Sequence, residues 1–210
     1  MNLKKSLCVL ITLFLFSSPA LSKSFELRSR SEYIHGVSSA HKDEIQYANR
    51  LSLNWEFKLK RINRTLRIAP YTEITYNFET DELSKTETGL EAEFEIVKYL
   101  NFHSAFQYAT INKHHDYICT GEDKINFELL NGIIFSIPTP LKIARKPIRF
   151  RARETYIYDL DSHRGTRNEV EGGFFWKAHK HLDLGIKWRH IDHIHYTDID
   201  ETVGVATLIF

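Results

Sequence analysis

Residues 201–210 read ETVGVATLIF, a short stretch of strand-forming residues that ends on the aromatic Phe210. In a strand, successive side chains point to opposite faces, and Val, Thr and Ile favour extended backbone. We expect two faces here, which separate Ala206, Leu208 and Phe210 from Val203, Val205 and Ile209. The stretch therefore predicts a final β-strand with an aromatic last residue.

The start of the chain has the pattern of an export signal. Two lysines precede a short apolar run, residues 8–16, and Ala20, Leu21 and Ser22 have the small-x-small spacing of a cleavage site. The apolar run is much shorter than the roughly 20 residues that a spanning helix needs. We therefore expect a signal peptide at residues 1–22 and one domain at residues 23–210.

Composition limits the class of partner. About 188 residues follow the expected cleavage site, enough for one domain. They carry 26 Lys and Arg against 27 Asp and Glu, a net charge of about −1 with His neutral, so no overall basic field for nucleic acid is expected. Cys119 is the only cysteine after the cleavage site, so no internal disulfide is expected.

A period of two runs through almost the whole chain. The alternating stretches lie at residues 25–33, 47–59, 66–78, 90–96, 100–108, 125–137, 148–158, 170–176, 182–190 and 201–210. The sixth is weaker, because Leu130 and Ile134 fall on the polar phase. About ten strands of about ten residues is an even count at the length of tilted membrane strands. Together with the export signal and the aromatic end, this predicts an all-β fold: a single antiparallel transmembrane β-barrel of about ten strands, both termini periplasmic, in the outer membrane of a Gram-negative bacterium.

The connections form a second pattern. Residues 60–64, 97–99 and 178–181 are short and would lie on the periplasmic side. Residues 36–45, 79–87, 112–124, 159–168 and 192–200 are longer and would lie outside. Short periplasmic turns and longer outer loops are typical of transmembrane barrels. The exception is residues 138–147, which we interpret as a longer, proline-bounded link on the short side.

Alternation alone does not decide which face is inside. A secreted, soluble, lipocalin-like barrel that binds a small apolar ligand would give the same period. Strand number, strand length, loop asymmetry and the terminal aromatic favour the membrane barrel. Aromatic residues near the expected strand ends, where membrane girdles form, favour it further: Tyr33, Tyr47, Tyr99, Tyr158, Trp176 and Tyr196.

Several stretches resemble a known group of proteins. The signal peptide, RFRARETYIYD at residues 149–159, LDLGIKWRH at residues 182–190 and the terminal LIF are similar to small bacterial outer-membrane barrels grouped only as a domain of unknown function. The resemblance covers essentially all of the chain after the signal. It implies fold and location, and it implies no activity.

If the barrel is inside-out, the charged face lines the lumen. The expected lumen residues are Glu26, Arg28, Arg30, Glu32, Arg50, Glu56, Arg67, Glu73, Glu91, Glu93, Glu95, Glu128, Arg149, Arg151, Arg153, Glu169, Glu171, Lys187 and Arg189. Three guanidiniums on one strand repel each other unless opposite charges on neighbouring strands meet them. Our hypothesis is that arginines and carboxylates pair and brace a largely occluded lumen. The alternative is a solvated polar lining without special geometry.

Enzymatic functions receive weak support. An outer-membrane protease of the omptin kind keeps Asp and His at its outer rim, and residues 192–200 supply both, but such enzymes are about half as long again. A lipid-modifying barrel needs a His beside a nucleophilic Ser, whereas His103 and Ser104 are consecutive and point to opposite faces. We therefore expect a non-enzymatic envelope component, narrow pore or surface-binding protein.

The sequence contains only weak candidates for a metal site. His193 and His195 lie two residues apart near Asp198, and His114 and His115 are adjacent, but neither group has a recognised ligand spacing. We expect no cofactor and no nucleic acid. The expected partners are outer-membrane lipids, including lipopolysaccharide, and the barrel-assembly machinery, which would bind the strand that ends at Phe210.

Overall fold

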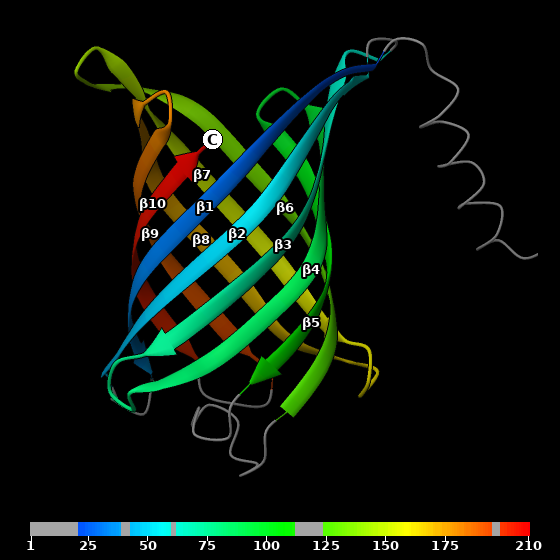
Figure 1. Ribbon diagram of the computed structural model, residues 1–210, viewed down its shortest axis with the longest axis vertical. Helices are drawn as coiled ribbons and strands as arrows, with labels where there is room; N and C mark the ends of the chain where they lie inside the picture. The colour runs from blue at the N-terminus through cyan, green and yellow to red at the C-terminus, as the bar shows by residue number, and fades with distance from the viewer. Residues whose placement is uncertain (1–20, 39–42, 60–61, 112–123, 195–197) are drawn as a thin grey trace, which may run out of the picture.

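The computed structural model describes residues 21–38, 43–59, 62–111, 124–194 and 198–210. These residues form one closed barrel of ten antiparallel strands (Figure 1), which confirms the predicted fold class. The strands are β1 (Leu21–Ser38), β2 (Asp43–Leu59), β3 (Arg64–Asn77), β4 (Glu82–Val97), β5 (Leu100–Ile111), β6 (Lys124–Ile143), β7 (Lys146–Asp159), β8 (Arg164–His179), β9 (Leu182–His193) and β10 (Ile199–Ile209).

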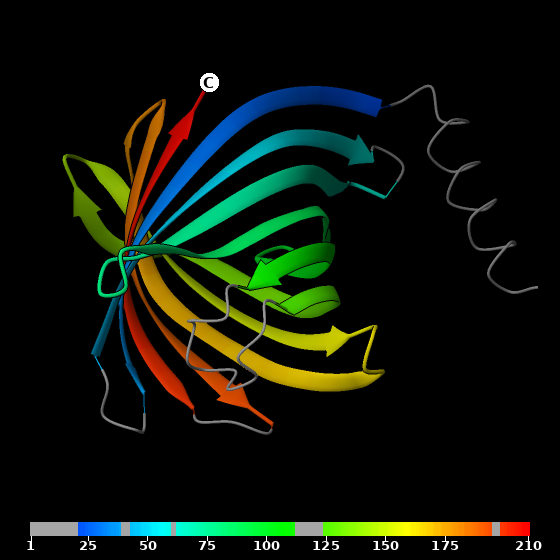
Figure 2. The same cartoon turned by 60° about the horizontal axis from the view of Figure 1, so that its bottom comes forward.

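Each strand pairs with its neighbours in the sequence, and β1 pairs with β10 to close the ring. Seen with one end brought forward, the strands surround a single axis (Figure 2). At the closure, the Phe210 amide donates to the Leu27 carbonyl at 2.9 Å, and the Leu27 amide donates back to Phe210 at 3.3 Å. The terminal stretch therefore completes the barrel.

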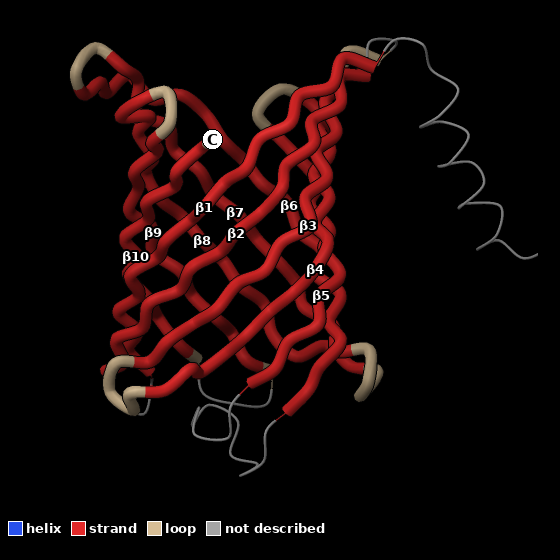
Figure 3. The backbone as a smooth tube through the Cα atoms, in the orientation of Figure 1, coloured by secondary structure: helices blue, strands red, loops and turns tan. Residues whose placement is uncertain are grey.

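The barrel has two different ends. β1 begins and β10 ends at the top of Figure 1, where β4–β5, β6–β7 and β8–β9 are joined; we call this the turn end. The opposite end, which we call the loop end, carries the connections from β3 to β4 and from β7 to β8 (Figure 3). Residues 1–20 of the expected signal peptide lie outside the described residues. β1 begins at Leu21, so the expected cleavage after Ser22 falls in its first residues.

Two of the expected long loops are wrong over most of their length. β4 begins at Glu82 and β8 at Arg164, so the connections at residues 78–81 and 160–163 are tight. Asp81 and His163 have positive φ values, 56° and 54°, which let the chain reverse direction in four residues. Residues 39–42, 112–123 and 195–197, in the other expected loops, lie outside the described residues.

The prediction of a longer, proline-bounded link at residues 138–147 is also wrong. β6 continues through Pro138 to Ile143, and only Ala144 and Arg145 form the turn. Both turn residues have positive φ, 49° and 66°, as a type I′ hairpin requires. The register with β7 shifts between Pro138 and Lys142. Proline is tolerated in a strand at such an irregularity, because it has no amide hydrogen to donate.

Burial decides which face is inside. Apolar side chains on the outer face are half exposed, such as Phe25 at 55%, Leu90 at 52% and Ile186 at 57%. Charged side chains on the other face are buried, with Glu128 at 1% and Lys187 at 6%. This arrangement is the inverse of a soluble barrel and is that of a transmembrane barrel. Among the described residues, no helix is long and apolar enough to cross a membrane.

Aromatic residues gather on the outer face. Tyr33 pairs in register with Tyr47, and Tyr47 pairs with Tyr76, so the three tyrosines form a row across β1, β2 and β3. Tyr99 lies at the turn end, where it is 37% exposed. The Trp176 indole donates to the Ile143 carbonyl at 3.1 Å. Tyr196 lies outside the described residues. The row is typical of the aromatic belts that sit at membrane interfaces.

The lumen also contains small apolar clusters. Ala105, Leu130 and Ile157 pack together on one wall, and a second cluster on the β10 side contains Ile34, Ala48, Val203 and Val205. This placement explains why Leu130 interrupts the alternation of the sixth stretch: it lies on the polar phase because it faces the lumen.

Candidate functional site

Two cavities of the lumen are separated by charged side chains. The loop-side cavity has a volume of about 180 Å³, and the turn-side cavity has a volume of about 460 Å³. Seven side chains line both cavities: Arg30, Glu32, Arg50, Glu91, Arg153, Glu171 and Lys187. We call these seven residues the ionic belt. Because they border both spaces, they lie between them.

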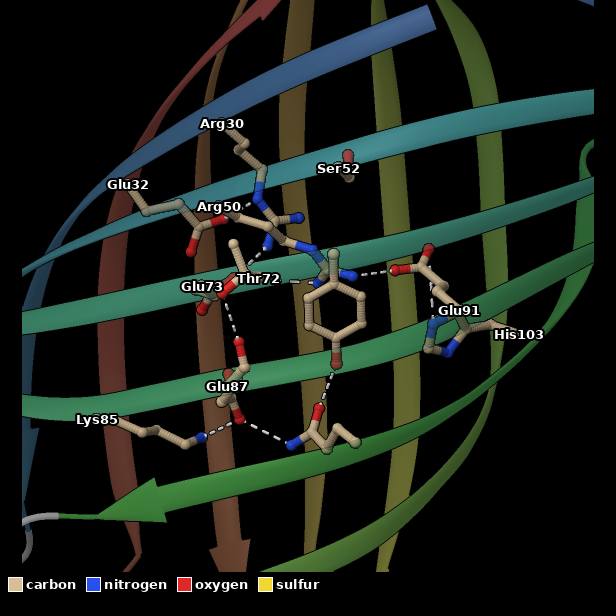
Figure 4. Close-up of polar contacts among 12 residues, drawn as sticks. Arg30, Glu32, Arg50, Ser52, Thr72, Glu73, Lys85, Glu87, Glu91 and His103 are labelled. Carbon is tan, nitrogen blue, oxygen red and sulfur yellow. Dashed lines mark hydrogen bonds and ion pairs between the residues drawn. The ribbon is translucent and has the colours of Figure 1, made fainter. Parts of the chain in front are cut away.

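Ion pairs join belt residues on nearby strands of the wall. Lys187 Nζ lies 3.1 Å from a carboxylate oxygen of Glu32 and 2.9 Å from one of Glu171. On the other side, Arg30 lies 3.4 Å from Glu32. Arg50 pairs with Glu91 (Figure 4). Charges held out of bulk water interact strongly, because the surrounding dielectric constant is low.

Further residues extend the belt to both sides. Arg30 lies 3.4 Å from Glu73 on β3, and Arg189 pairs with Glu201 on β10. His103 on β5 is 1% exposed, and its Nε2 lies 3.7 Å from Glu91. A guanidinium nitrogen of Arg153 on β7 lies 3.4 Å from the His103 Nδ1. The contacts therefore continue around most of the wall.

A second cluster lies on the loop side of the belt. The Gln107 amide donates to Glu87 and to Glu128, each at 2.7 Å. Lys85 lies 2.5 Å from Glu87, and Arg167 lies 3.0 Å from Glu128. Arg167 also pairs with Glu169 at 2.9 Å. Together with the belt and the residues that extend it, this cluster gives a polar network to which all ten strands contribute.

Tyr71 connects the two groups. Its ring lies under the Arg50 guanidinium, 3.5 Å from the ring centre, and its hydroxyl donates to Gln107 at 2.5 Å. Gly89 is its cross-strand partner on β4. A Cβ at Gly89 would lie 2.9 Å from the Tyr71 ring and 2.6 Å from the Phe106 carbonyl oxygen. Glycine is therefore what lets the ring lie flat across β4.

The two cavities differ in charge. Among the described residues, the loop-side cavity is lined by seven cations and seven carboxylates: Arg30, Arg50, Lys85, Arg153, Arg167, Lys187 and Arg189 against Glu32, Glu73, Glu87, Glu91, Glu169, Glu171 and Glu201. The turn-side cavity is lined by nine cations and six carboxylates: Arg28, Arg30, Arg50, Arg67, Arg149, Arg151, Arg153, Lys177 and Lys187 against Glu26, Glu32, Glu91, Glu93, Glu171 and Asp183. The turn-side cavity therefore has an excess of three positive charges.

The structure brings together most of the lumen residues expected from the sequence. Fourteen of the nineteen expected lumen residues form ion pairs: Glu26, Arg28, Arg30, Glu32, Arg50, Arg67, Glu73, Glu91, Glu93, Glu128, Glu169, Glu171, Lys187 and Arg189. Glu56, Glu95 and Arg149 line a third space of about 330 Å³ near the mouth of the turn end. Among the described residues, Glu56, Glu95, Arg149, Arg151 and Arg153 form no ion pair, so the bracing hypothesis does not extend to the arginines of β7.

The sequence missed part of the network. Lys85, Glu87 and Arg167 were assigned to loops, and Tyr71, His103, Gln107 and Glu201 were not among the lumen candidates. One signal was available: Lys85 and Glu87 continue the odd-numbered phase of Glu91, and Arg167 continues that of Glu169. If the alternation is continued beyond the last apolar residue of each stretch, Lys85, Glu87 and Arg167 fall on the lumen face.

The metal candidates remain predictions. His114, His115 and His195 lie outside the described residues. The His193 side chain lines the loop-side cavity, while its backbone amide donates to Asp198 at 3.2 Å. Within the described part of the chain, no three His, Cys, Asp or Glu side chains are grouped to hold a metal ion.

The two residues considered for a lipid-modifying site lie on opposite faces. His103 is buried in the lumen, whereas the Ser104 hydroxyl donates to Asn131 at 3.0 Å on the outer face. They therefore form no nucleophile-base pair. A closed backbone, an apolar outer surface and a charged lumen together define the class of this protein, a transmembrane β-barrel.

Comparisons with known proteins add a fold likeness only. No family model and no curated protein matches the sequence. The β domain of the Bordetella autotransporter Brka aligns with a TM-score of 0.48 at 10% identity, covering 89% of this chain and all of that one. A KdgM porin in complex with disordered oligogalacturonate aligns with a TM-score of 0.45 at 8% identity, covering 86% of this chain and 99% of that one. The NanC porin aligns with a TM-score of 0.40 at 11% identity, covering 87% of this chain and 98% of that one. The fold described above rests on the strand pairing of this chain.

Proposed function

We propose that this protein is a non-enzymatic barrel of the Gram-negative outer membrane and that its lumen is a narrow pore constricted by the ionic belt. Its turn end would face the periplasm, as short turns do in such barrels. The apolar outer face would contact outer-membrane lipids, including lipopolysaccharide at the loop end. The strand ending at Phe210 would be recognised by the barrel-assembly machinery.

One observation carries the proposal: the same seven belt side chains line the cavities on both sides of the constriction. Barrels of eight strands are filled by side chains, and barrels of sixteen strands hold a wide channel. A ten-stranded barrel lies near the filled limit, so its side chains decide what passes. Ion pairs fix six of the seven belt side chains, all except Arg153, which makes the constriction narrow and well defined.

The test is conductance across planar lipid bilayers. The belt variant carries Arg50→Ala and Glu91→Ala, which removes one ion pair of the constriction without changing net charge. The matched control carries Glu26→Ala and Arg28→Ala, an ion pair of 2.6 Å that lines only the turn-side cavity. We expect a small wild-type conductance, a several-fold increase in the belt variant and little change in the control.

Two results would count against the pore. One is equal conductance in all three proteins, which would mean that the belt does not limit passage. The other is the absence of current in both the wild type and the belt variant, which would leave a bracing role in the envelope. Slower migration of boiled than of unboiled samples on a denaturing gel verifies that each variant is folded.

A further inference from the structure

The lumen face of β7 carries three arginines that form no ion pair with a carboxylate of the described residues. Arg149, Arg151 and Arg153 follow one another at every second position. Among the described residues, no carboxylate oxygen lies within 4.0 Å of their guanidinium nitrogens. The hydrogen-bond partners of Arg153 are neutral, the Thr155 hydroxyl at 2.8 Å and the His103 ring nitrogen at 3.4 Å. The other lumen arginines, by contrast, pair with glutamates.

The strand register explains the difference. The cross-strand neighbours of Arg149 are Pro138 and Phe175, and those of Arg151 are Ser136 and Gly173, all uncharged. Arg153 faces Glu171, but that carboxylate lies 2.9 Å from Lys187 instead. The residues directly opposite Arg149 and Arg151 therefore supply no acidic partner, and Glu93 and Glu171 attract Arg151 only from beyond ion-pair distance.

These arginines account for the charge excess of the turn-side cavity. All three line it, and its cations exceed its carboxylates by three, whereas the loop-side cavity is balanced. A cavity with low-dielectric walls and one sign of excess charge concentrates ions of the opposite sign. Glu93 and Glu171 compensate Arg151 and Arg153 only from beyond ion-pair distance, so a bound anion would stabilise this wall.

We propose that the turn-side cavity is a binding site for a small oxyanion that carries two or more phosphate or carboxylate groups. Alternate residues of a strand are about 7 Å apart, so the three guanidiniums form a ladder that can contact separate groups of one solute. The planar guanidinium binds phosphate and carboxylate through two parallel hydrogen bonds. A volume of about 460 Å³ is in the range of small-molecule sites.

The site lies on the turn side of the constriction, with which it shares Arg153, and is reached from the turn end. The third space, near the turn-end mouth, shares Arg149, Arg67 and Asn101 with the turn-side cavity. A solute that enters there meets Arg149 and Arg151 before the belt. Binding therefore goes beyond the proposed pore function, because it requires no passage through the belt.

Isothermal titration calorimetry on the folded protein in detergent tests the site. The probes are citrate and pyrophosphate at constant ionic strength, which separate a carboxylate ligand from a phosphate ligand. The test variant carries Arg149→Gln, Arg151→Gln and Arg153→Gln. The matched control carries Lys142→Gln, Arg145→Gln and Lys146→Gln, which removes the same charge from the exposed β6–β7 hairpin.

We expect the wild type to bind at least one probe, the test variant to bind it at least ten-fold more weakly, and the control to keep the wild-type affinity. If the test variant does not fold, Arg151→Gln alone should weaken binding several-fold. Absence of binding by the wild type, unchanged affinity in the test variant, or an equal loss in the control would overturn the site. Because the assay measures no current, such a failure leaves the conductance test of the pore intact.

Discussion

Lys187 on β9 forms an ion pair of 3.1 Å with Glu32 on β1, although β10 lies between these two strands. The register explains how this is possible. Val203 of β10 is the partner of Lys187, and Val205 is the partner of Glu32. Both valines face the lumen and are short, so the lysine side chain passes over them. The pair therefore braces the three strands at which the barrel closes.

Removing this lysine should destabilise the barrel strongly. Lys187→Met leaves Glu32 and Glu171 buried without their shared cation, and breaking such a pair costs about 3 kcal/mol. Urea unfolding in phospholipid vesicles, followed by tryptophan fluorescence, measures the loss. Lys98→Met, which removes an exposed lysine at a turn, should stay within about 0.5 kcal/mol of the wild type. A similar small effect for Lys187→Met would mean that the ion pair contributes no bracing.

Gly89 should not tolerate a side chain. In Gly89→Ala, the new Cβ would meet the Phe106 carbonyl oxygen at 2.6 Å and displace the Tyr71 ring, so we expect a loss of about 1 to 3 kcal/mol in unfolding free energy. Gly172→Ala is the control, because a Cβ there meets nothing within 4 Å. Equal stability of the two variants would contradict the close packing of Tyr71 on β4.

Gln107 should contribute more to the stability of the barrel than a typical neutral side chain does. In Gln107→Leu, Glu87 and Glu128 lose the amide that binds both carboxylates, which should cost about 3 kcal/mol. Gln46→Leu removes an amide that donates to one carboxylate only, that of Glu44 at 2.7 Å, and should cost about 1 kcal/mol. The same unfolding assay compares them. A larger loss of unfolding free energy for Gln46→Leu than for Gln107→Leu would contradict the role of Gln107 in the cluster on the loop side of the belt.

The β6–β7 turn should be improvable. Ala144 and Arg145 both have positive φ, which costs an ordinary residue about 1 kcal/mol or more. Ala144→Asn with Arg145→Gly supplies the residues that a type I′ turn favours, so the variant should unfold at a free energy about 1 kcal/mol higher. A control with Lys146→Gly, just outside the turn, should show no gain. Destabilisation by the turn variant would refute the turn assignment.

The period-two pattern was sufficient to predict the ten strands and their faces. It failed at strand ends where polar residues alternate with other polar residues. Lys85 and Glu87 alternate with threonines, and Arg167 lies between Thr166 and Asn168, so no apolar residue marks the outer face there. These strand ends were therefore predicted as loops. The turn at Ala144 was missed for a related reason, since it contains neither glycine nor asparagine.

The pairing of the lumen charges was beyond sequence reasoning. Which glutamate meets which arginine depends on the register between strands, and a period of two fixes only the face. Arg149 and Arg50 are equivalent in the sequence pattern. Only the structure shows that Arg50 lies opposite Glu73 and reaches Glu91 two strands away, while Arg149 has uncharged neighbours. The charge excess of the turn-side cavity follows from that register.

The central claim is that the apolar face meets lipid and the charged face lines the lumen. Tryptophan fluorescence tests it directly, because two of the three tryptophans of the chain, Trp55 and Trp188, lie on the outer face, and Trp176 follows the same phase at the turn end, where it also borders the turn-side cavity. In vesicles of brominated phospholipid, the account predicts strong quenching of their emission and weak quenching by aqueous iodide. Strong quenching by iodide with none by the brominated lipid would contradict it, because the tryptophans would then face water.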